Sequence, residues 1–289
     1  AQYVVLRPDV PMPFGTYGAS VTVADLTGDG IDDLLVAETP KDPPDTLDTA
    51  RLHIFAGGRT FTTVPDQTIT VTGSGLVLGN YGRTLTVGDY DGNGALDIAV
   101  GNMNQTVGGL LQAGSLVVHW GPTFSSSSEY VNPTPKAGDF FGTGLKSADV
   151  NGDGIDDLIE GSGRAAHAEL AMVGKIHVFL GPTLTLHATI PNPLGLENAR
   201  FAEGLHVADL TGDGLPEFVA ADVKNRLFIL WGPDWSSYSM QKRPPTSYQN
   251  PFGETVYGEK IVSLDANGDG HADLAICDYF GGLVSGCQA

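Results

Sequence analysis

Apolar and polar residues alternate along short segments of this chain. Val21 and Val23 alternate with Thr22 and Ala24, an acidic turn follows, and residues 34–37 form a continuous apolar run. Alternation with a period of two is typical of a half-buried strand, and a short apolar run between turns is typical of a fully buried strand. Helical periodicity is absent over any useful length, so the pattern predicts an all-β protein.

The same pattern recurs five times. The five copies begin with an aromatic residue, at Tyr17, Tyr81, Phe141, Phe201 and Tyr257. Each copy continues with an apolar strand, an acidic turn and a second apolar strand. The repeat is about 60 residues long, and self-similarity at such a period is typical of propellers and solenoids.

A third strand follows the first two in four of the five units, and a fourth strand follows the third. The third is an apolar run closed by Gly and then Gly or Pro, and it begins at Arg51, Ser115, Lys175 and Arg226. A variable segment such as residues 68–72 supplies the fourth strand. Four strands per unit is the pattern of a β-propeller blade.

We therefore predict a single domain over residues 1–289, a β-propeller of about five four-stranded antiparallel blades. The predicted units are residues 14–79, 80–138, 139–198, 199–255 and 256–289. The last unit lacks a fourth strand, and we expect residues 3–6, within the leading segment 1–13, to supply it and close the ring.

The acidic turns have the pattern D-x-(T/D/N)-G-(D/N)-G-x-x-(D/E), which places oxygen ligands at alternate positions. Such oxygen-only sets suit a hard cation with flexible geometry, so we expect about five Ca²⁺ ions. Zinc is disfavoured because no Cys or His side chain recurs. The expected ligands, with the seventh residue of each turn binding through its carbonyl, are Asp25, Thr27, Asp29, Ile31 and Asp33; Asp89, Asp91, Asn93, Ala95 and Asp97; Asp149, Asn151, Asp153, Ile155 and Asp157; Asp209, Thr211, Asp213, Leu215 and Glu217; and Asp265, Asn267, Asp269, His271 and Asp273.

Two positions of each turn have distinct expected tasks. The sixth residue is always Gly, which lets the backbone take a positive φ and wrap around an ion. The ninth residue is always acidic, and we expect it to bind the ion with both oxygens. Residues 149–160 also match the EF-hand pattern through Glu160, but the other turns have apolar residues at that place. We interpret Glu160 as a coincidence.

Charge and composition narrow the range of functions. The chain has 34 acidic and 15 basic residues, a net charge of −19, and the acidic turns hold most of the excess. Such a charge argues against binding to nucleic acid or to anionic membranes. No run of 18 apolar residues is present, so membrane insertion is not expected. The sequence starts at Ala1 without a signal segment, as expected for a processed or trimmed chain.

The two cysteines, Cys277 and Cys287, lie ten residues apart across a Gly-Gly turn. They are compatible with two free thiols or with one disulfide, which would indicate an oxidising compartment. The sequence leaves both alternatives open.

Together the aromatic-Gly start, the apolar strand, the acidic turn and the closing apolar-Gly-Pro strand resemble FG-GAP repeats. These repeats form the β-propeller of integrin α subunits and of related bacterial and fungal proteins. The resemblance implies calcium in the first hairpin loop of each blade and ligand recognition on the opposite face. Integrin-like propellers usually have seven blades, whereas this chain has five repeats, so it is either a smaller closed ring, which the closing strand favours, or a piece of a longer propeller. Unit four also departs, with Ala202 in place of Gly and Glu217 in place of Asp.

The leading functional hypothesis is a secreted or cell-surface calcium-binding module that recognises a protein. Long loops at residues 39–50, 102–114 and 161–174 form the expected recognition face. The alternative is a lectin with sites between blades, which Trp120, Trp231 and Trp235 could serve. A polysaccharide-active enzyme ranks third. No nucleophile or zinc-protease signature is present, so we predict that the chain is not an enzyme.

Overall fold

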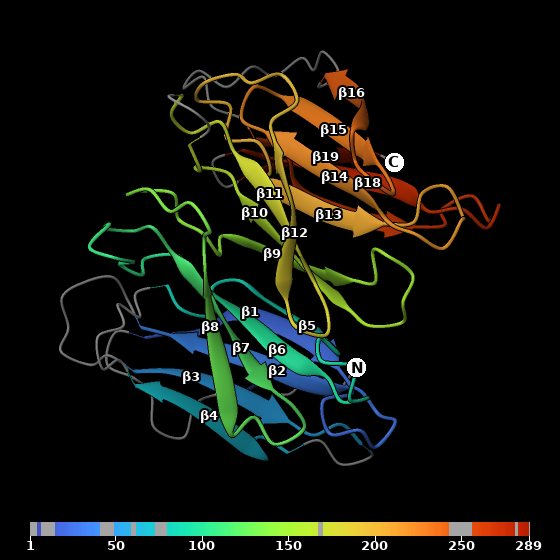
Figure 1. The fold of residues 1–289 in the computed structure, drawn as a ribbon. Helices are drawn as coiled ribbons and strands as arrows, with labels where there is room; N and C mark the ends of the chain where they lie inside the picture. Colours follow the sequence, from blue (N-terminus) through green and yellow to red (C-terminus); the bar gives the residue numbers. More distant parts are fainter. Residues whose placement is uncertain are drawn as a thin grey trace. The chain divides into compact units, whose positions relative to one another are not determined.

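The computed structural model describes residues 5–6, 15–40, 49–58, 62–72, 80–166, 170–242, 256–280 and 283–288. Over these residues the chain is all-β and contains no helix (Figure 1). The chain divides into two compact units, Ala1–Leu145 and Lys146–Ala289. The predicted all-β fold class is confirmed.

The first unit contains two four-stranded antiparallel sheets, each built in sequence order. The strands of the first sheet are β1 (Thr16–Ala24), β2 (Asp33–Thr39), β3 (Thr49–Phe55) and β4 (Gln67–Thr72). Those of the second sheet are β5 (Leu85–Gly88), β6 (Asp97–Asn102), β7 (Ser115–Trp120) and β8 (Ser126–Val131).

Three further sheets are also built in sequence order. The boundary between the two compact units, between Leu145 and Lys146, lies within the first strand of the third sheet. The strands of the third sheet are β9 (Gly144–Ala148), β10 (Asp157–Ser162), β11 (Lys175–Leu180) and β12 (Thr185–Pro191). Those of the fourth are β13 (Gly204–Ala208), β14 (Glu217–Asp222), β15 (Arg226–Trp231) and β16 (Ser237–Lys242). The fifth has three described strands, β17 (Val256–Leu264), β18 (Asp273–Phe280) and β19 (Leu283–Gln288).

Such consecutive four-stranded meanders are the blades of a β-propeller. Closure of the ring and a single domain over the whole chain stay predictions, and the expected closing strand at residues 3–6 lies largely outside the described residues. The structure has no helix in its described segments with the length and apolar character needed to cross a bilayer.

Burial differs from strand to strand within a sheet. Every residue of β6, β10 and β14 is buried, whereas the fourth strands β8 and β16 are mostly exposed. Strands buried on both faces have continuous apolar runs, and strands with one solvated face alternate. The apolar runs after each acidic turn are therefore the central strands of the sheets.

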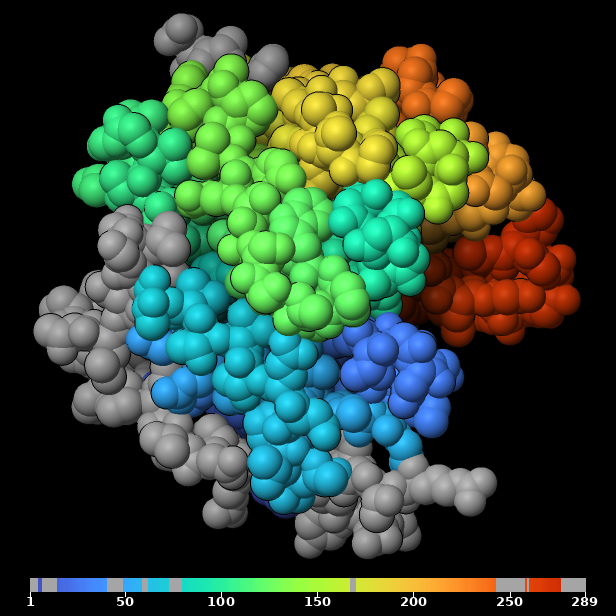
Figure 2. Space-filling model, turned by 60° about the horizontal axis from the view of Figure 1, so that its bottom comes forward, coloured from blue at the N-terminus to red at the C-terminus, as the bar shows by residue number. Residues whose placement is uncertain are grey.

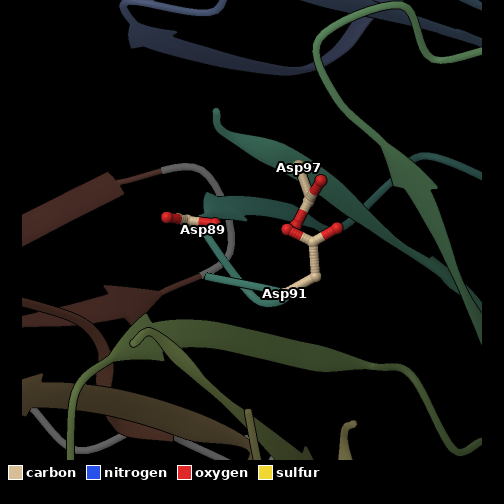
Figure 3. Close-up of side chains that lie close together, drawn as sticks. All are labelled: Asp89, Asp91 and Asp97. Carbon is tan, nitrogen blue, oxygen red and sulfur yellow. The ribbon is translucent and has the colours of Figure 1, made fainter. Parts of the chain in front are cut away.

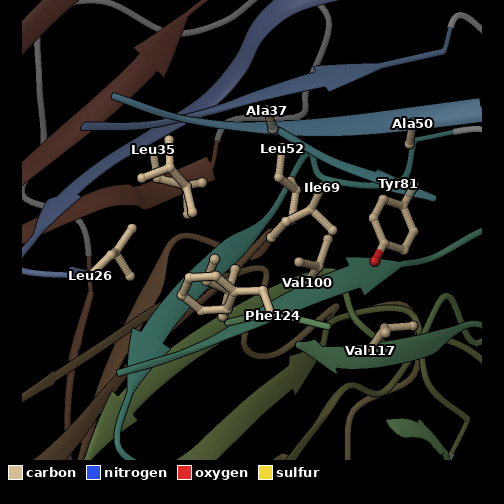
Figure 4. Packing of buried hydrophobic residues seen from close by; sticks show 12 residues of the cluster. Leu26, Leu35, Ala37, Ala50, Leu52, Ile69, Tyr81, Val100, Val117 and Phe124 are labelled. Atoms are coloured by element: carbon tan, nitrogen blue, oxygen red, sulfur yellow. The ribbon is translucent and has the colours of Figure 1, made fainter. Parts of the chain in front are cut away.

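Apolar side chains join neighbouring sheets within each unit. In the first unit one cluster includes Leu35 and Leu52 from the first sheet together with Ile98 and Val100 from the second (Figure 4). The space-filling view shows the blue atoms of the first sheet adjoining the green atoms of the second (Figure 2). In the second unit Ile176, Phe201 and Phe228 belong to a similar cluster.

The aromatic-Gly pair at the start of the second and third repeats contacts the preceding sheet. Tyr81 is buried, and its carbonyl oxygen accepts a hydrogen bond from Thr39 Oγ1 of the preceding sheet at 2.8 Å. At the next repeat Thr84 Oγ1 donates to the carbonyl of Gly142 at 2.7 Å. Gly142 has a φ of 90°, and a Cβ there would lie 2.4 Å from the carbonyl oxygen of Ser115. Glycine is required at this contact because a side chain would collide with the neighbouring backbone.

Candidate functional site

Each acidic turn connects the first and second strands of its sheet. The ninth residue of the turn is the first residue of the second strand, as Asp33 is in β2 and Asp97 is in β6. The hairpin therefore fixes the ninth carboxylate on a buried central strand, while the earlier acidic residues project from an exposed loop.

The first Asp of the turn organises the loop backbone. Asp25 Oδ1 accepts hydrogen bonds from the N–H groups of Gly28 at 2.8 Å and Asp29 at 3.0 Å, and its Oδ2 accepts from Gly30 at 2.8 Å. The same arrangement recurs at Asp149, Asp209 and Asp265. Backbone N–H donors favour the ionised carboxylate and hold the pKa of Asp209 and Asp265 below the usual value.

The second turn brings three carboxylates together. One oxygen each from Asp89, Asp91 and Asp97 lies within 4.8 Å of the other two. Figure 3 shows Asp91 and Asp97 turned towards each other, with Asp89 beside them on the same loop. Oxygen donors in such a group match the preference of Ca²⁺, and a cation there would relieve the repulsion among three negative charges. Among the described residues this is the one group of three His, Cys, Asp or Glu side chains whose ligand atoms lie within 4.8 Å of one another.

Burial distinguishes the ninth carboxylate from the others. Asp97 and Asp157 are fully buried, and burial is the main cause that raises the pKa of each to about 6. The neighbouring carboxylates of the turn raise these two pKa values further, and backbone N–H donors oppose the rise. Burial also raises the pKa of Glu217. A cation at the turn would favour the ionised form of all three.

The ninth carboxylate also connects distant parts of its sheet. Asp97 Oδ2 accepts from Tyr90 N at 3.0 Å, and its Oδ1 accepts from Gly121 N at 2.7 Å. Asp33 and Asp157 make the equivalent bond to the Gly that closes the third strand, Gly57 or Gly181. The expected two-oxygen metal ligand is therefore also the acceptor of two backbone hydrogen bonds, a role that we did not predict. The recurring Gly-Gly or Gly-Pro at the end of the third strand is the sequence feature that could have indicated this contact.

The glycines of the turn take the expected conformation. The sixth residues Gly30, Gly94, Gly154, Gly214 and Gly270 all have φ between 84° and 89°. The fourth residue is also Gly in every turn and also has a positive φ, from 72° to 80°. Both positions lie in the region that glycine favours, so the backbone can fold its N–H groups around the first Asp.

Glu160 lies away from the turn that it follows in sequence. It is buried in β10, where it accepts hydrogen bonds from Ser162 and contacts His177 Nδ1 at 2.9 Å. This pair resembles Glu38 and His53 of the first sheet, where Nε2 lies 3.1 Å from the carboxylate. Glu160 thus forms a buried polar contact with a neighbouring strand, although it completes an EF-hand pattern in the sequence.

The three tryptophans have different surroundings. Trp120 and Trp231 are half-buried, and each indole N–H donates to a serine of the adjacent fourth strand, Ser128 or Ser239. Trp235 is buried and stacks on Phe218 with ring centroids 4.6 Å apart. Trp235 is thus a core residue, whereas the other two are partly exposed to solvent.

Comparison with known proteins gives similarity to two kinds of protein. Integrin alpha-PS2 of Drosophila melanogaster is 26% identical over an alignment of 222 residues, and the match covers 68% of this chain and 15% of that protein. The resemblance to integrin-like propellers is confirmed. The phosphatidylinositol-glycan-specific phospholipase D of Mus musculus is 29% identical over an alignment of 188 residues, and the match covers 59% of this chain and 22% of the enzyme. The chain thus spans less than a quarter of the length of these relatives.

Two further comparisons add less. The chain matches no protein-family model. The crystal structure of rhamnogalacturonan lyase YesW aligns with 83% of this chain and 52% of its own, with a TM-score of 0.48 and 14% identity. This partial likeness carries no functional argument.

The similarity to a phospholipase D corrects one prediction. We predicted from the absence of catalytic signatures that the chain is not an enzyme, and that prediction is wrong because relatives include a protein whose name identifies it as an enzyme. The physical reason is that a calcium-type turn and a blade core specify a scaffold, and the same scaffold occurs in proteins of different activity.

Proposed function

We propose that the chain is a calcium-stabilised, extracellular recognition module that binds a protein partner. The observation that carries the proposal is the acidic turn, repeated five times, whose second copy holds Asp89, Asp91 and Asp97 within 4.8 Å of one another. Similarity to integrin alpha-PS2 and to integrin alpha-4 of Xenopus laevis supports the recognition role. The secreted or cell-surface location is part of the same proposal.

Calcium would be held by residues of the turn alone. In the second turn the ligands would be the side chains of Asp89, Asp91, Asn93 and Asp97 and the carbonyl of Ala95. Equivalent residues would serve in the other four turns. The ion would neutralise carboxylates that otherwise repel one another, so it would stabilise the folded chain by binding to the native state alone.

The partner would bind at the opposite end of the sheets. The second acidic turn precedes β6, and the long loop 102–114 follows β6, so the two lie at opposite ends of one strand. The loop carries Leu111, a residue that is 69% exposed. Binding residues occur disproportionately on loops held by a rigid scaffold, so the loop that carries Leu111 is the proposed contact. Of the other two long loops, residues 41–48 and 167–169 lie outside the described residues.

A direct test separates the two parts of the proposal. The chain is screened against a panel of purified extracellular proteins, once in calcium and once in EDTA, with Leu111→Asp as the surface variant. We expect calcium-dependent binding that Leu111→Asp weakens at least tenfold, with an unchanged melting temperature. Binding that is indifferent to both changes would contradict the proposal.

The second candidate function is carbohydrate binding. The half-exposed indoles of Trp120 and Trp231, each fixed by a serine of the fourth strand, favour it because sugars stack on aromatic faces. A glycan array would give hits that Trp120→Ala and Trp231→Ala remove. An empty array with a folded, calcium-loaded sample would leave the protein-recognition role as the better account.

A further inference from the structure

A cavity of about 360 Å³ lies in the first unit, where the first sheet meets the start of the second repeat. Its lining includes Thr16 and Gly18 of β1, Thr39 at the end of β2, and Asn80 and Arg83 of the segment that leads into β5. Thr16 and Thr39 are paired at the end of the β1–β2 hairpin that is remote from its acidic turn. The cavity is therefore separate from the expected calcium ligands.

The walls of this cavity are held by hydrogen bonds to the backbone. The hydroxyls of Thr39 and Ser20 donate to the carbonyls of Tyr81 and Gly82, which fixes the second repeat against the first sheet. The register of β1 is irregular around Gly18, and a Cβ added there would meet no atom of the described residues within 4 Å. Ligand pockets measure roughly 300–1,000 Å³, so this cavity is large enough for a small ligand.

Arg83 supplies the positive charge of the cavity. Its Nη1 donates to Asn80 Oδ1 at 3.0 Å, and its backbone N–H donates to the Asn80 carbonyl at 3.2 Å. Within the described ranges no carboxylate pairs with Arg83. The residue is exposed, and a guanidinium has five N–H donors, so the group fixed by Asn80 can still donate to a ligand.

The fourth repeat has a neutralised pair at the same two places. Arg200 and Glu203 correspond there to Asn80 and Arg83, and they form an ion pair in which Arg200 Nε lies 3.2 Å from Glu203 Oε2. The third repeat has the neutral Thr143 at the place of Arg83. The fold therefore does not require a cation at this place, and the charge of Arg83 is left for an anionic ligand.

We propose that this cavity binds a hydroxylated carboxylate of the size of one sugar ring, which is the chemistry of a uronic acid. Arg83 would bind the carboxylate through two parallel N–H···O bonds. The hydroxyls of Thr16 and Thr39 and the amide of Asn80 are neutral groups suited to the hydroxyls of the ligand. The acidic side chain of a protein would use the guanidinium alone, so the lining favours a sugar acid. This site goes beyond the proposed protein recognition and is distinct from Trp120 and Trp231.

The repeat itself supplies the variant that tests the site. Arg83→Thr gives the second repeat the residue that the third already has, so it should fold with an unchanged melting temperature. Arg83→Lys keeps the charge but loses the planar pair of donors. Lys224→Thr is the control, because it removes one exposed cation that lies outside the cavity.

Binding is measured by titration with D-glucuronate, followed by NMR, at a fixed concentration of free calcium because carboxylates bind calcium. We expect saturable binding to the unmodified chain and to Lys224→Thr with equal affinity. Arg83→Thr should weaken it at least tenfold, and Arg83→Lys should weaken it by less. An equal affinity of Arg83→Thr, or no saturable binding to the folded unmodified chain, would overturn the proposal.

Two further ligands test what the cavity recognises. D-glucose lacks the carboxylate and should bind at least tenfold more weakly than glucuronate, and equal binding would overturn the role of Arg83. N-acetyl-aspartate N-methylamide carries the acidic side chain of a protein, and its tighter binding would overturn the assignment to a sugar acid. Leu111→Asp should leave glucuronate binding unchanged, so failure of the recognition proposal and failure of this one are distinguishable.

Discussion

Gly121 N–H donates a hydrogen bond of 2.7 Å to Asp97 Oδ1, and this bond joins the end of β7 to the start of β6. Tyr90 N–H donates to the other oxygen of the same carboxylate at 3.0 Å. A residue expected to bind metal therefore also holds the blade together. The equivalent bonds of Asp33 and Asp157 show that this arrangement belongs to the repeat.

Substitution of two neighbouring carboxylates should separate the structural role from the metal role. In EDTA, Asp97→Asn should lower the free energy of unfolding by about 1–3 kcal/mol, because its amide group presents N–H donors to backbone donors. Asp91→Asn should change it by less than about 0.5 kcal/mol in EDTA, since Asp91 lies on the loop surface. Both variants should weaken calcium binding at this turn. Urea denaturation with and without calcium measures these effects, and equal losses in EDTA would contradict the assignment.

The glycine that closes the third strand should be essential only where the acidic turn approaches it. A Cβ at Gly121 would lie 2.2 Å from the carbonyl oxygen of Leu96, whereas the nearest atom to a Cβ at Gly232 is 3.7 Å away. Gly121→Ala should therefore cost about 2 kcal/mol or more, and the matched change Gly232→Ala well under half of that. Thermal denaturation of the two variants tests this difference, which similar losses would refute.

The second position of the aromatic-Gly pair should tolerate a Cβ in the fourth repeat but not in the third. Gly142→Ala places a Cβ against the Ser115 carbonyl at a φ of 90°, so we expect a loss of about 3 kcal/mol. Ala202 occupies the same place in the fourth sheet with a φ of 66°. Ala202→Gly should relieve backbone strain but lose a buried methyl group, and the net change should stay within about 1 kcal/mol. A tolerated Gly142→Ala variant would contradict this role of the pair.

As the pH rises, the stability of the calcium-free chain should fall, whereas its affinity for calcium should rise. Burial raises the pKa of Asp97 and Asp157 to about 6, above the value of about 4 expected in the unfolded chain. Their contribution to stability is therefore complete below about pH 4 and is lost as pH rises through about 6. Without calcium the chain should be less stable at pH 7 than at pH 4.5. With calcium the order should reverse, because protons compete with the ion.

Denaturation midpoints at both pH values, in EDTA and in calcium, test this behaviour. Calcium titrations at pH 5 and pH 7 should give weaker binding at the lower pH. A calcium affinity that does not change between these pH values would contradict the role of the buried carboxylates.

The sequence was sufficient to predict the sheets because the repeat marks the first two strands five times and the third strand four times. Continuous apolar runs such as the one after Asp33 predicted the buried central strands, and they are β2 and its equivalents. The positive φ of Gly30 followed from its place in the turn. Both features depend on local sequence, and repetition removes the ambiguity of a single copy.

Other features depend on contacts that a local pattern does not contain. The hydrogen bond between Gly57 N–H and Asp33 joins residues 24 positions apart, and only the pairing of the strands brings them together. The error about enzymatic relatives has another cause, because blade residues such as Asp97 specify the scaffold and carry no information about an activity elsewhere in a longer protein.

Calcium titration of the metal-free chain by isothermal titration calorimetry, with the melting temperature measured before and after, tests the central claim most directly. We predict saturable binding of about five ions and a rise of several degrees in melting temperature. The double variant Asp29→Ala and Asp153→Ala should bind fewer ions. A chain that binds no calcium and melts at the same temperature in calcium and in EDTA would contradict the account.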